Sequence, residues 1–380
     1  MILRLAEVVA VLDQIYDPRT AEDWDRVGLV TGDLEQPVRR VLLAVDPAQA
    51  VIEEAVEWGA DLLLTHHPLL LRGVHGVATT DPKGRAVTRL VRAGVALHVT
   101  HTNADVADPG VSDALAAALG VLDPGPLEPL NDEARVKLVT FVPVGSVEAV
   151  MDALAAAGAG TIGDYERCAW TIDGVGTFRA TEAARPAVGS VGSTEHVPET
   201  RVEMVVPAGS SAAVVAALRS AHPYEEPAFD LVPLASAVGR RGTGRVGRLP
   251  EPITLEAFGQ RVADSLPATP AGVRVAGDPY RVVEAVAVCG GAGDGLFAAV
   301  RRSGADVYVT ADLRHHPASE ALEHGSPALV DCAHWATEWP WLRDAERLLL
   351  GGLGGEAATV ETRVSKVVTD PWTATARSQS

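Results

Sequence analysis

The fold is decided by residues 59–68, which read G-A-D-L-L-L-T-H-H-P. In this stretch a glycine suited to ending a helix precedes a short apolar run typical of a buried strand, and polar residues follow the run directly. The pattern returns at residues 304–310, which read G-A-D-V-Y-V-T and again follow a helical segment. The repeat predicts two related α/β lobes that form one outer domain.

The segments around the first copy alternate between strands and helices. Strands are expected at Val41–Asp46, Asp61–Thr65 and Val95–Thr100, and helices at Ala48–Gly59, Pro82–Gly94 and Val111–Gly120. Such alternation predicts a mainly parallel sheet with helices on its faces.

The middle of the chain has a different order of elements. Strands are expected at Lys137–Val144, Trp170–Ala180, Arg201–Val206 and Ala228–Leu234, and helices at Ser146–Ala157 and Ser210–Ala221. This βαββαβ order predicts a ferredoxin-like domain. Ser146 and Ser210 are expected to cap its two helices.

Two segments rich in proline, glycine and charge flank this middle block, and both are expected to be loops: Asp123–Glu133 and Ala235–Arg248. They make the block an insertion into the outer domain. We therefore expect a first lobe of the outer domain at residues 1–130 and the insertion at residues 131–236. The second lobe is expected at residues 237–368, followed by a loose polar tail at 369–380.

The composition argues against several classes of function. The 380 residues carry 32 Lys and Arg against 50 Asp and Glu, which gives a net charge of −18. This acidity opposes broad binding to nucleic acid or to anionic membranes, and no apolar stretch reaches the ~20 residues that span a bilayer. The first residues lack the order of a signal peptide, so we expect a cytoplasmic protein. Three cysteines without C-x-x-C spacing predict neither a disulfide framework nor a thiolate zinc site.

Histidine and carboxylate residues follow the predicted strands, at the edge where open α/β sheets build their sites. The pair His66-His67 follows one strand, and the pattern H-x-x-x-D/E occurs in each lobe, as His101 to Asp105 and as His334 to Glu338. Imidazole and carboxylate are common ligands of divalent metals, and carboxylates from opposite lobes could bridge two ions. A donor set without cysteine fits zinc, iron or manganese better than calcium.

A single histidine at a strand end is more often a hydrogen-bonded structural residue than a metal ligand. Two lobes with the same element at the same place favour a shared metal site instead. Asp312 and His316 are candidates for supporting the ligands, with helix capping and ordinary surface positions as the alternative. The other histidines outside the pattern are interpreted as structural, namely His75, His98, His196 and His324.

Three weaker signals leave alternatives open. The glycine-rich segment Cys289–Gly295 favours a tight turn over a phosphate-binding loop, because its spacing matches no nucleotide motif. The segment Asp23–Leu29 carries an indole and acidic groups that either line a cleft or pack against the sheet. The arginines of Arg240–Arg248 form either an anion-binding patch or, as we favour, a solvated linker face.

Taken together, these motifs resemble the Nif-three-like family of dinuclear-metal hexamers, whose bacterial members are often labelled type 2 GTP cyclohydrolase I homologs. The outer domain carries D-W-D-R-V-G at 23–28, T-H-H-P at 65–68, H-T-N-A-D at 101–105, D-V-Y-V-T-A-D-L-R-H-H at 306–316 and H-W-A-T-E at 334–338. The middle block carries H-P-Y-E-E-P-A-F-D at 222–230 and the segments 163–168 and 174–179, similar to the inserted domain of longer bacterial members.

The resemblance implies two divalent metal ions per chain, held by His66, His67, Asp105, His334 and Glu338. His101 is implied as a further ligand or a close neighbour, and we interpret it as a proton shuttle if it is not a ligand. The resemblance also implies a homohexameric ring, a trimer of dimers, and an insertion similar to trimeric signalling domains of the nitrogen-regulator type. The sequence departs from the family at Arg26, where Asn is usual, and at His315-His316, where a Tyr-His pair is usual.

Two functions are consistent with these observations. The first is a metal-dependent hydrolase of a nucleotide-like substrate such as GTP, with water as the nucleophile because no Ser or Cys nucleophile motif is present. The second is a non-catalytic metal-handling or regulatory scaffold ring, which the size of the insertion favours. Nucleotide turnover that depends on Glu338 distinguishes the first from the second.

Overall fold

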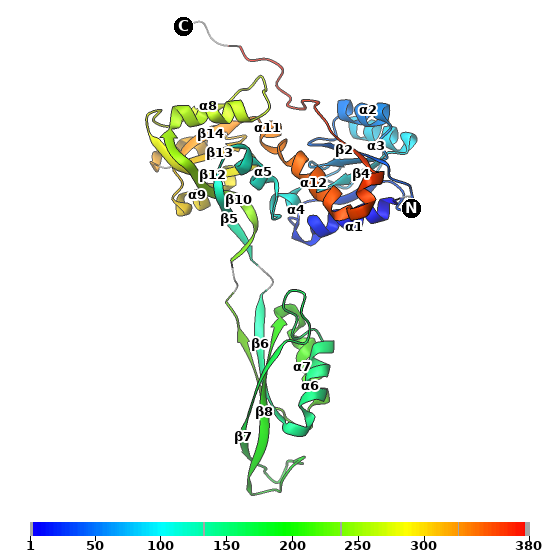
Figure 1. Ribbon diagram of the computed structural model, residues 1–380, viewed down its shortest axis with the longest axis vertical. Coiled ribbons are helices and arrows are strands. Elements are labelled where there is room, and N and C mark those ends of the chain that lie inside the picture. Colours follow the sequence, from blue (N-terminus) through cyan, green and yellow to red (C-terminus); the bar gives the residue numbers. More distant parts are fainter. Residues whose placement is uncertain (1–2, 132–133, 236–237, 326, 377–380) are drawn as a thin grey trace. The chain divides into compact units, whose positions relative to one another are not determined.

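The computed structural model describes residues 3–131, 134–235, 238–325 and 327–376 (Figure 1). The chain divides into two compact units: one contains Met1–Leu130 and Arg240–Ser380, and the other contains Asn131–Gly239. Within the described ranges, no helix is both long enough and apolar enough to cross a membrane.

The first lobe is a five-stranded sheet of order β1-β4-β3-β2-β15. Its strands are β1 (Gly28–Thr31), β2 (Arg40–Ala44), β3 (Leu62–Thr65), β4 (Ala96–Val99) and β15 (Glu361–Val364). Its helices are α1 (Leu5–Ile15), α2 (Gln49–Trp58), α3 (Pro82–Ala93), α4 (Thr102–Asp105) and α5 (Val111–Ala118). All strand pairs are parallel except β1 with β4, so the prediction of a mainly parallel sheet is confirmed.

The second lobe is a six-stranded sheet of order β11-β14-β13-β12-β10-β5. Its strands are β5 (Leu122–Asn131), β10 (Val238–Thr254), β11 (Arg274–Ala276), β12 (Val282–Ala292), β13 (Val307–Ala311) and β14 (Ala328–Cys332). Its helices are α8 (Leu255–Ser265), α9 (Phe297–Ser303), α10 (His315–Glu323), α11 (His334–Glu338) and α12 (Trp341–Leu353). The order β11-β14-β13-β12 repeats β1-β4-β3-β2, and this confirms the two related lobes.

The repeated G-A-D sequence makes the same contacts in both lobes. Gly59 and Gly304 end α2 and α9 in the left-handed conformation, at φ of 73° and 72°. Asp61 accepts hydrogen bonds from two backbone N–H groups at the start of β2, at 2.7 and 2.9 Å. Asp306 accepts two near the start of β12, at 3.0 and 2.9 Å. In each lobe the motif therefore ends a helix and attaches the next strand to its neighbour.

Each sheet is covered on both faces. In the first lobe α2 and α3 pack on one face through residues such as Ile52 and Leu90, and in the second α9 and α10 do so through Phe297 and Ala321. The opposite faces of both sheets contribute to one large core that also contains residues of α1, α5, α8 and α12. This shared core brings together the strand ends that carry the predicted site.

The unit of residues 131–239 is built from β6 (Arg135–Pro143), α6 (Val147–Ala156), β7 (Ala169–Arg179), β8 (Thr194–Pro207), α7 (Ser211–Ala221) and β9 (Phe229–Pro233). Its antiparallel sheet has the order β7-β8-β6-β9. Residues of α6, α7 and this sheet form a separate hydrophobic core. The chain therefore has the predicted order of elements in this region.

Two local predictions are wrong. Most of the expected loops, Asp123–Glu133 and Ala235–Arg248, belongs to strands β5 and β10, apart from residues 132–133 and 236–237, which lie outside the described part. Proline is tolerated in β5 because β5 is an edge strand, where a missing N–H costs no sheet hydrogen bond. Ser146 and Ser210 stand at the starts of α6 and α7, but neither side chain makes a capping hydrogen bond. A 3₁₀ turn precedes each helix and leaves these serines in a helical conformation.

Candidate metal centre

The predicted site residues lie just beyond the carboxyl ends of three strands. His66 and His67 follow β3, His101 lies just before α4, and Asp105 is the last residue of α4. His334 and Glu338 are the first and last residues of α11, which follows β14. The two H-x-x-x-D/E elements are therefore short helical turns rather than strand ends, and the four-residue spacing turns both side chains of each element to one side.

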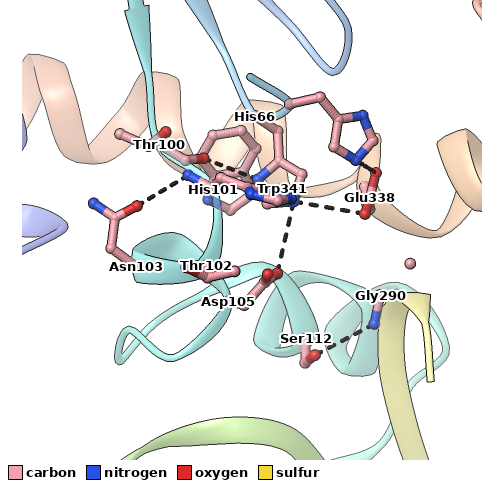
Figure 2. A network of polar contacts seen from close by, with 12 residues as sticks. His66, Thr100, His101, Thr102, Asn103, Asp105, Ser112, Gly290, Glu338 and Trp341 are labelled. Atoms are coloured by element: carbon pink, nitrogen blue, oxygen red, sulfur yellow. Dashed lines mark hydrogen bonds and ion pairs between the residues drawn. The ribbon is translucent and has the colours of Figure 1, made fainter. Parts of the chain in front are cut away.

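Glu338 lies at the centre of the cluster. Its Oε1 is 3.0 Å from Nε2 of His334 and 3.5 Å from Nε2 of His66, while its Oε2 is 3.2 Å from Nε2 of His67. Asp105 approaches from the other side, with Oδ1 3.7 Å from Nε2 of His66. Figure 2 shows His66, Asp105 and Glu338 pointing toward one another from three different elements. Both lobes thus contribute to one site.

Each of the four histidines has its Nδ1 held by an oxygen. The partners are the backbone carbonyl of Thr100 for His66 (2.9 Å), Asp46 for His67 (2.7 Å), Asp25 for His101 (2.9 Å) and Asp312 for His334 (2.6 Å). A carbonyl oxygen can only accept, so Nδ1 of His66 carries the proton and Nε2 offers a lone pair. Such partners behind the ring are characteristic of metal-ligating histidines, because they set the tautomer and the orientation of the ring.

The electrostatics of the cluster depend on opposite charges in a buried place. Burial would raise the pKa of Glu338, but His67, His66 and His334 hold it well below the usual range. Burial would lower the pKa of His67, but Glu338 and Asp46 raise it to about 11; Glu338 and Asp312 likewise raise that of His334 to about 9 against the effect of burial. Burial raises the pKa of Asp105 to about 6. The carboxylates thus strongly favour positive charge on the neighbouring imidazoles.

Two buried atoms of the cluster have no hydrogen-bonding partner in the described part of the chain: Nε2 of His66 and Oε2 of Glu338. Leaving such groups unpaired is costly unless another group is bound there. Two sets of donor atoms lie within 4.8 Å of one another, His66 with His67 and His101, and His67 with His334 and Glu338. Either set could hold a metal ion, but His67 can serve only one, because its Nδ1 is held by Asp46 and only its Nε2 offers a lone pair.

The glycine-rich segment Cys289–Gly295 packs against this cluster. Gly291 has a φ of 70°, and a Cβ there would lie 2.6 Å from Oε1 of Glu338 and 3.1 Å from Nε2 of His334. The N–H of Gly291 donates to Oγ1 of Thr337 at 2.9 Å. A glycine at this position therefore leaves room for the central carboxylate and for whatever it binds.

A cavity of about 730 Å³ opens beside His67 and His334. Its lining includes Asp46, Asp312 and Arg274, together with several residues between Thr369 and Ala376. Within this segment, expected to be loose, the Thr375 hydroxyl donates to the Pro270 carbonyl and the Thr369 hydroxyl to Asp46. Residues 377–380 lie outside the described part.

The structure shows which of the weaker candidate residues contact the metal-binding cluster and which do not. Asp312 contacts His334, whereas His316 is exposed on α10, where its ring contacts His315. In the segment Asp23–Leu29, Asp25 is buried and also accepts from the hydroxyl and the N–H of Thr102. Asp25 therefore belongs to the support of His101.

The arginine segment Arg240–Arg248 is engaged in ion pairs. Arg240 pairs with Asp108 at 3.0 Å and Arg248 with Glu284 at 2.8 Å. Arg245 is buried against Asp113 at 2.6 Å, so the expectation of a solvated linker face is wrong for this residue. Its guanidinium also donates to three backbone carbonyls.

The sequence analysis missed Asp46 as part of the site. Asp46 follows β2, which is parallel to β3, and both strands end at the same edge of the sheet. A carboxylate at the end of the strand next to His66-His67 was the signal that could have identified it.

The chain matches the family described as Duf34/NIF3 (NGG1p interacting factor 3) over residues 3–371. It belongs to this family. The resemblance proposed from the motifs is therefore confirmed.

Among relatives, a Mycobacterium tuberculosis protein named GTP cyclohydrolase 1 type 2 homolog is 51% identical over 373 residues, which are 98% of this chain and 97% of the relative. The crystal structure of a Bacillus cereus protein related to NIF3 is 36% identical with a TM-score of 0.73, covering 98% of this chain and 99% of that one. The crystal structure of a Staphylococcus aureus protein is 28% identical with a TM-score of 0.82, covering 97% and 98%. The fold of this chain is thus that of its NIF3-related neighbours over nearly the whole length.

Proposed function

We propose that this chain binds two divalent metal ions and hydrolyses a nucleotide-like substrate. The observation that carries the proposal is the arrangement of three imidazoles around Glu338, with that of His101 beside His66 and His67, each with Nδ1 held by an oxygen. Structural histidines rarely need such uniform support of Nδ1, whereas metal ligands do, because it turns every Nε2 toward the ion.

We assign one ion to each set of donors. His66 would hold the first, with Asp105 and His101 beside it, and His67, His334 and Glu338 would hold the second, because the single free nitrogen of His67 can serve only one ion. Nitrogen and carboxylate donors without thiolate favour zinc, iron or manganese. When bound, such an ion lowers the pKa of a coordinated water toward ~7 and polarises the atom that is attacked.

The thiols of the outer domain do not compete with water as nucleophile. Burial raises the pKa of Cys289 and of Cys332 to about 12, so both thiols stay protonated at neutral pH. The residues of the chain would instead orient the reactants. Asp25 and Asp46 hold the rings of His101 and His67, and His101 moves a proton if it is not itself a ligand.

The cavity beside His67 and His334 supports a substrate larger than a simple ion. Its volume of about 730 Å³ suits a nucleotide, and its lining includes the side chains of Arg274, Trp335 and Trp372. An arginine can pair with phosphate, and an indole can stack on a base. The name of the curated relatives, GTP cyclohydrolase 1 type 2 homolog, agrees with this substrate class.

The experiment is a turnover screen on purified chain loaded separately with zinc, manganese or iron. A panel of nucleoside triphosphates is incubated with each form, and chromatography separates base-opened products from released phosphate. We expect turnover that is lost in Glu338→Gln and kept in Glu323→Gln, an exposed glutamate on α10. A chain that retains two ions and turns over no nucleotide would contradict the hydrolase.

That negative result would support the second candidate, a metal-handling or regulatory scaffold. The observation in its favour is that residues 131–239 form a compact unit with their own core and their own cavity. We propose a ferredoxin-like assignment for this unit on the basis of its strand order, β7-β8-β6-β9.

We also propose that six chains assemble as a ring, a trimer of dimers. The proposal rests on the resemblance to the Nif-three-like family. Light scattering coupled to size-exclusion chromatography measures the mass of the particle, for which the chain mass of 39.6 kDa predicts six-fold multiples. A monomer or a lone dimer at working concentration would contradict it.

A further inference from the structure

The unit of residues 131–239 contains a cavity of about 680 Å³ that the metal centre does not use. It is lined by the glycine-containing part of β7, the segment 180–187 that follows β7, the middle of β8 and the loop that follows α7. Its lining includes Gly174, Gly176, Glu199 and Tyr224. The cavity thus brings together two motifs noted in the sequence, residues 174–179 and 222–230.

A carboxylate without a cation lines this cavity. Glu199 is only 8% exposed, and its Oε1 accepts a hydrogen bond from the hydroxyl of Tyr224 at 2.7 Å. In the described part of the chain, Oε2 has no hydrogen-bonding partner, and no Lys, Arg or His nitrogen forms an ion pair with this carboxylate. Burying a charge in this way is costly unless a positive partner binds.

The surrounding residues hold Glu199 in place. A Cβ at position 176 would lie 1.9 Å from Oε2 of Glu199, so Gly176 provides the space that the carboxylate occupies. Nε2 of His222 bonds the carbonyl of Phe141 at 3.0 Å, and Nδ1 of His222 accepts the N–H of Tyr224 at 3.0 Å. His222 is therefore neutral in this arrangement: it orients Tyr224, which in turn orients Glu199, and it supplies no positive charge.

The lining as a whole is largely apolar, contains three aromatic rings and is net acidic. Phe141, Phe178 and Tyr224 contribute rings, with those of Phe178 and Tyr224 5.9 Å apart. The charged residues of the lining are Asp173, Glu199, Glu225, Glu226, Arg185 and Arg201, which is four carboxylates against two guanidinium groups. Arg201 is already paired with Glu203 at 2.8 Å. A carboxylate next to aromatic rings is the usual environment for an organic cation.

We propose that this cavity binds a small organic cation, an ammonium group on an apolar body, with Glu199 as its counter-ion. The rings of Phe178 and Tyr224 would pack on the apolar body, and the ammonium would donate to the free oxygen of Glu199. The proposal does not depend on the function of the metal centre, because all of its residues belong to the other unit.

The test uses three probes with the same phenylalkyl body and different charge: 2-phenylethylammonium, 2-phenylethanol and 3-phenylpropionate. Isothermal titration calorimetry measures their binding to the full-length chain. We expect the ammonium to bind about tenfold more tightly than the alcohol, and the carboxylate to bind least, because a charge-assisted hydrogen bond and a cation–π contact favour only the ammonium. Equal binding of all three, preference for the anion, or no binding by any probe would overturn the proposal.

Glu199→Gln keeps the shape of the side chain and removes the charge, so it should abolish the preference for ammonium over alcohol. Glu195→Gln is the matched control on the same strand: Glu195 does not line the cavity and accepts hydrogen bonds from the N–H of Ser190 and the hydroxyl of Ser193. Circular dichroism checks that both variants fold. Should Glu199→Gln not fold, Tyr224→Phe removes only the hydrogen bond to Glu199 and should weaken ammonium binding alone. Unchanged preference in a folded Glu199→Gln or Tyr224→Phe would contradict the assignment.

Discussion

The two lobes of the outer domain share a framework but contribute different chemistry at the same positions. After β3 the first lobe has His66 and His67, whereas after the matching residues of β13 the second has Ala311 and Asp312. His67 points its Nε2 at Glu338, while Asp312 holds Nδ1 of His334. At this strand end the first lobe therefore supplies a candidate ligand, His67, whereas the second lobe supplies Asp312, which orients another candidate ligand.

A second position differs in the same way. The pairing of β2 with β3 and the pairing of β12 with β13 align the two lobes. When residues are counted forward along β2 and β12 from these pairs, Asp46 in the first lobe corresponds to Gly291 in the second. Asp46 holds His67, and Gly291 leaves space for Glu338. The two lobes repeat the same sheet, but the side chains at matching positions differ because all the candidate ligands converge on one site.

The largest expected effect is that of Glu338→Gln, because this carboxylate contacts imidazoles from both lobes. The metal content of dialysed protein, measured by elemental analysis, should fall from the proposed two ions per chain to nearly none. Asp105→Asn should also lower the metal content, and the double variant should lose little more than Glu338→Gln alone, since ligands of one cluster act as a unit. Full occupancy in Glu338→Gln would refute the shared site.

The next comparison sets the two adjacent histidines of the first lobe against each other. Nε2 of His66 lies next to Asp105, and Nε2 of His67 lies next to Oε2 of Glu338. Each imidazole has one free nitrogen, so His66→Ala and His67→Ala should deplete different ions, and each should keep about one ion per chain. His75→Ala, an exposed histidine outside the cluster, is the control and should keep both ions. Loss of both ions in either variant would contradict the assignment of the two histidines to different ions.

Gly291→Ala tests the corresponding position in the second lobe. The new Cβ would meet Glu338 and His334, and the residue would be strained at a φ of 70°. We expect loss of metal together with a drop in stability of about 1–3 kcal/mol, measured by urea unfolding. Gly295→Ala is the matched control in the same segment, because nothing lies within 4 Å of its added Cβ. Unchanged metal content in Gly291→Ala would mean that the close approach is unimportant.

The smallest effect concerns His98, which occupies the place in β4 that Val330 occupies in β14. Burial lowers the pKa of His98 to about 4 from the usual 6.5, so between these values the unfolded chain binds the proton more readily than the folded one. Stability contributed by the neutral ring is thus lost as the pH falls below 6.5. His98→Val should remove about 2 kcal/mol of the stability difference between about pH 8 and about pH 5. Urea unfolding curves that shift in parallel for both proteins would contradict this.

The sequence predicted the framework well because its signals are local. The repeated G-A-D motif marks where a helix ends and a buried strand begins, and short apolar runs need no distant information to be recognised. Its errors came where local composition was misleading. The Pro- and Gly-rich segment of β5 was expected to be a loop, but a sheet edge accepts prolines that a central strand would not.

For the site, the sequence by itself determined which residues are available: His66, His67, His101, Asp105, His334 and Glu338 all stand directly after predicted strands. Only the tertiary structure decided that they converge, since His66 and Glu338 are separated by most of the chain and lie 3.5 Å apart. The tertiary structure also decided which oxygen contacts Nδ1 of each histidine. Asp25, Asp46 and Asp312 reach their histidines across sheet edges and loops, and such contacts depend on how packed elements are placed, which no local pattern encodes.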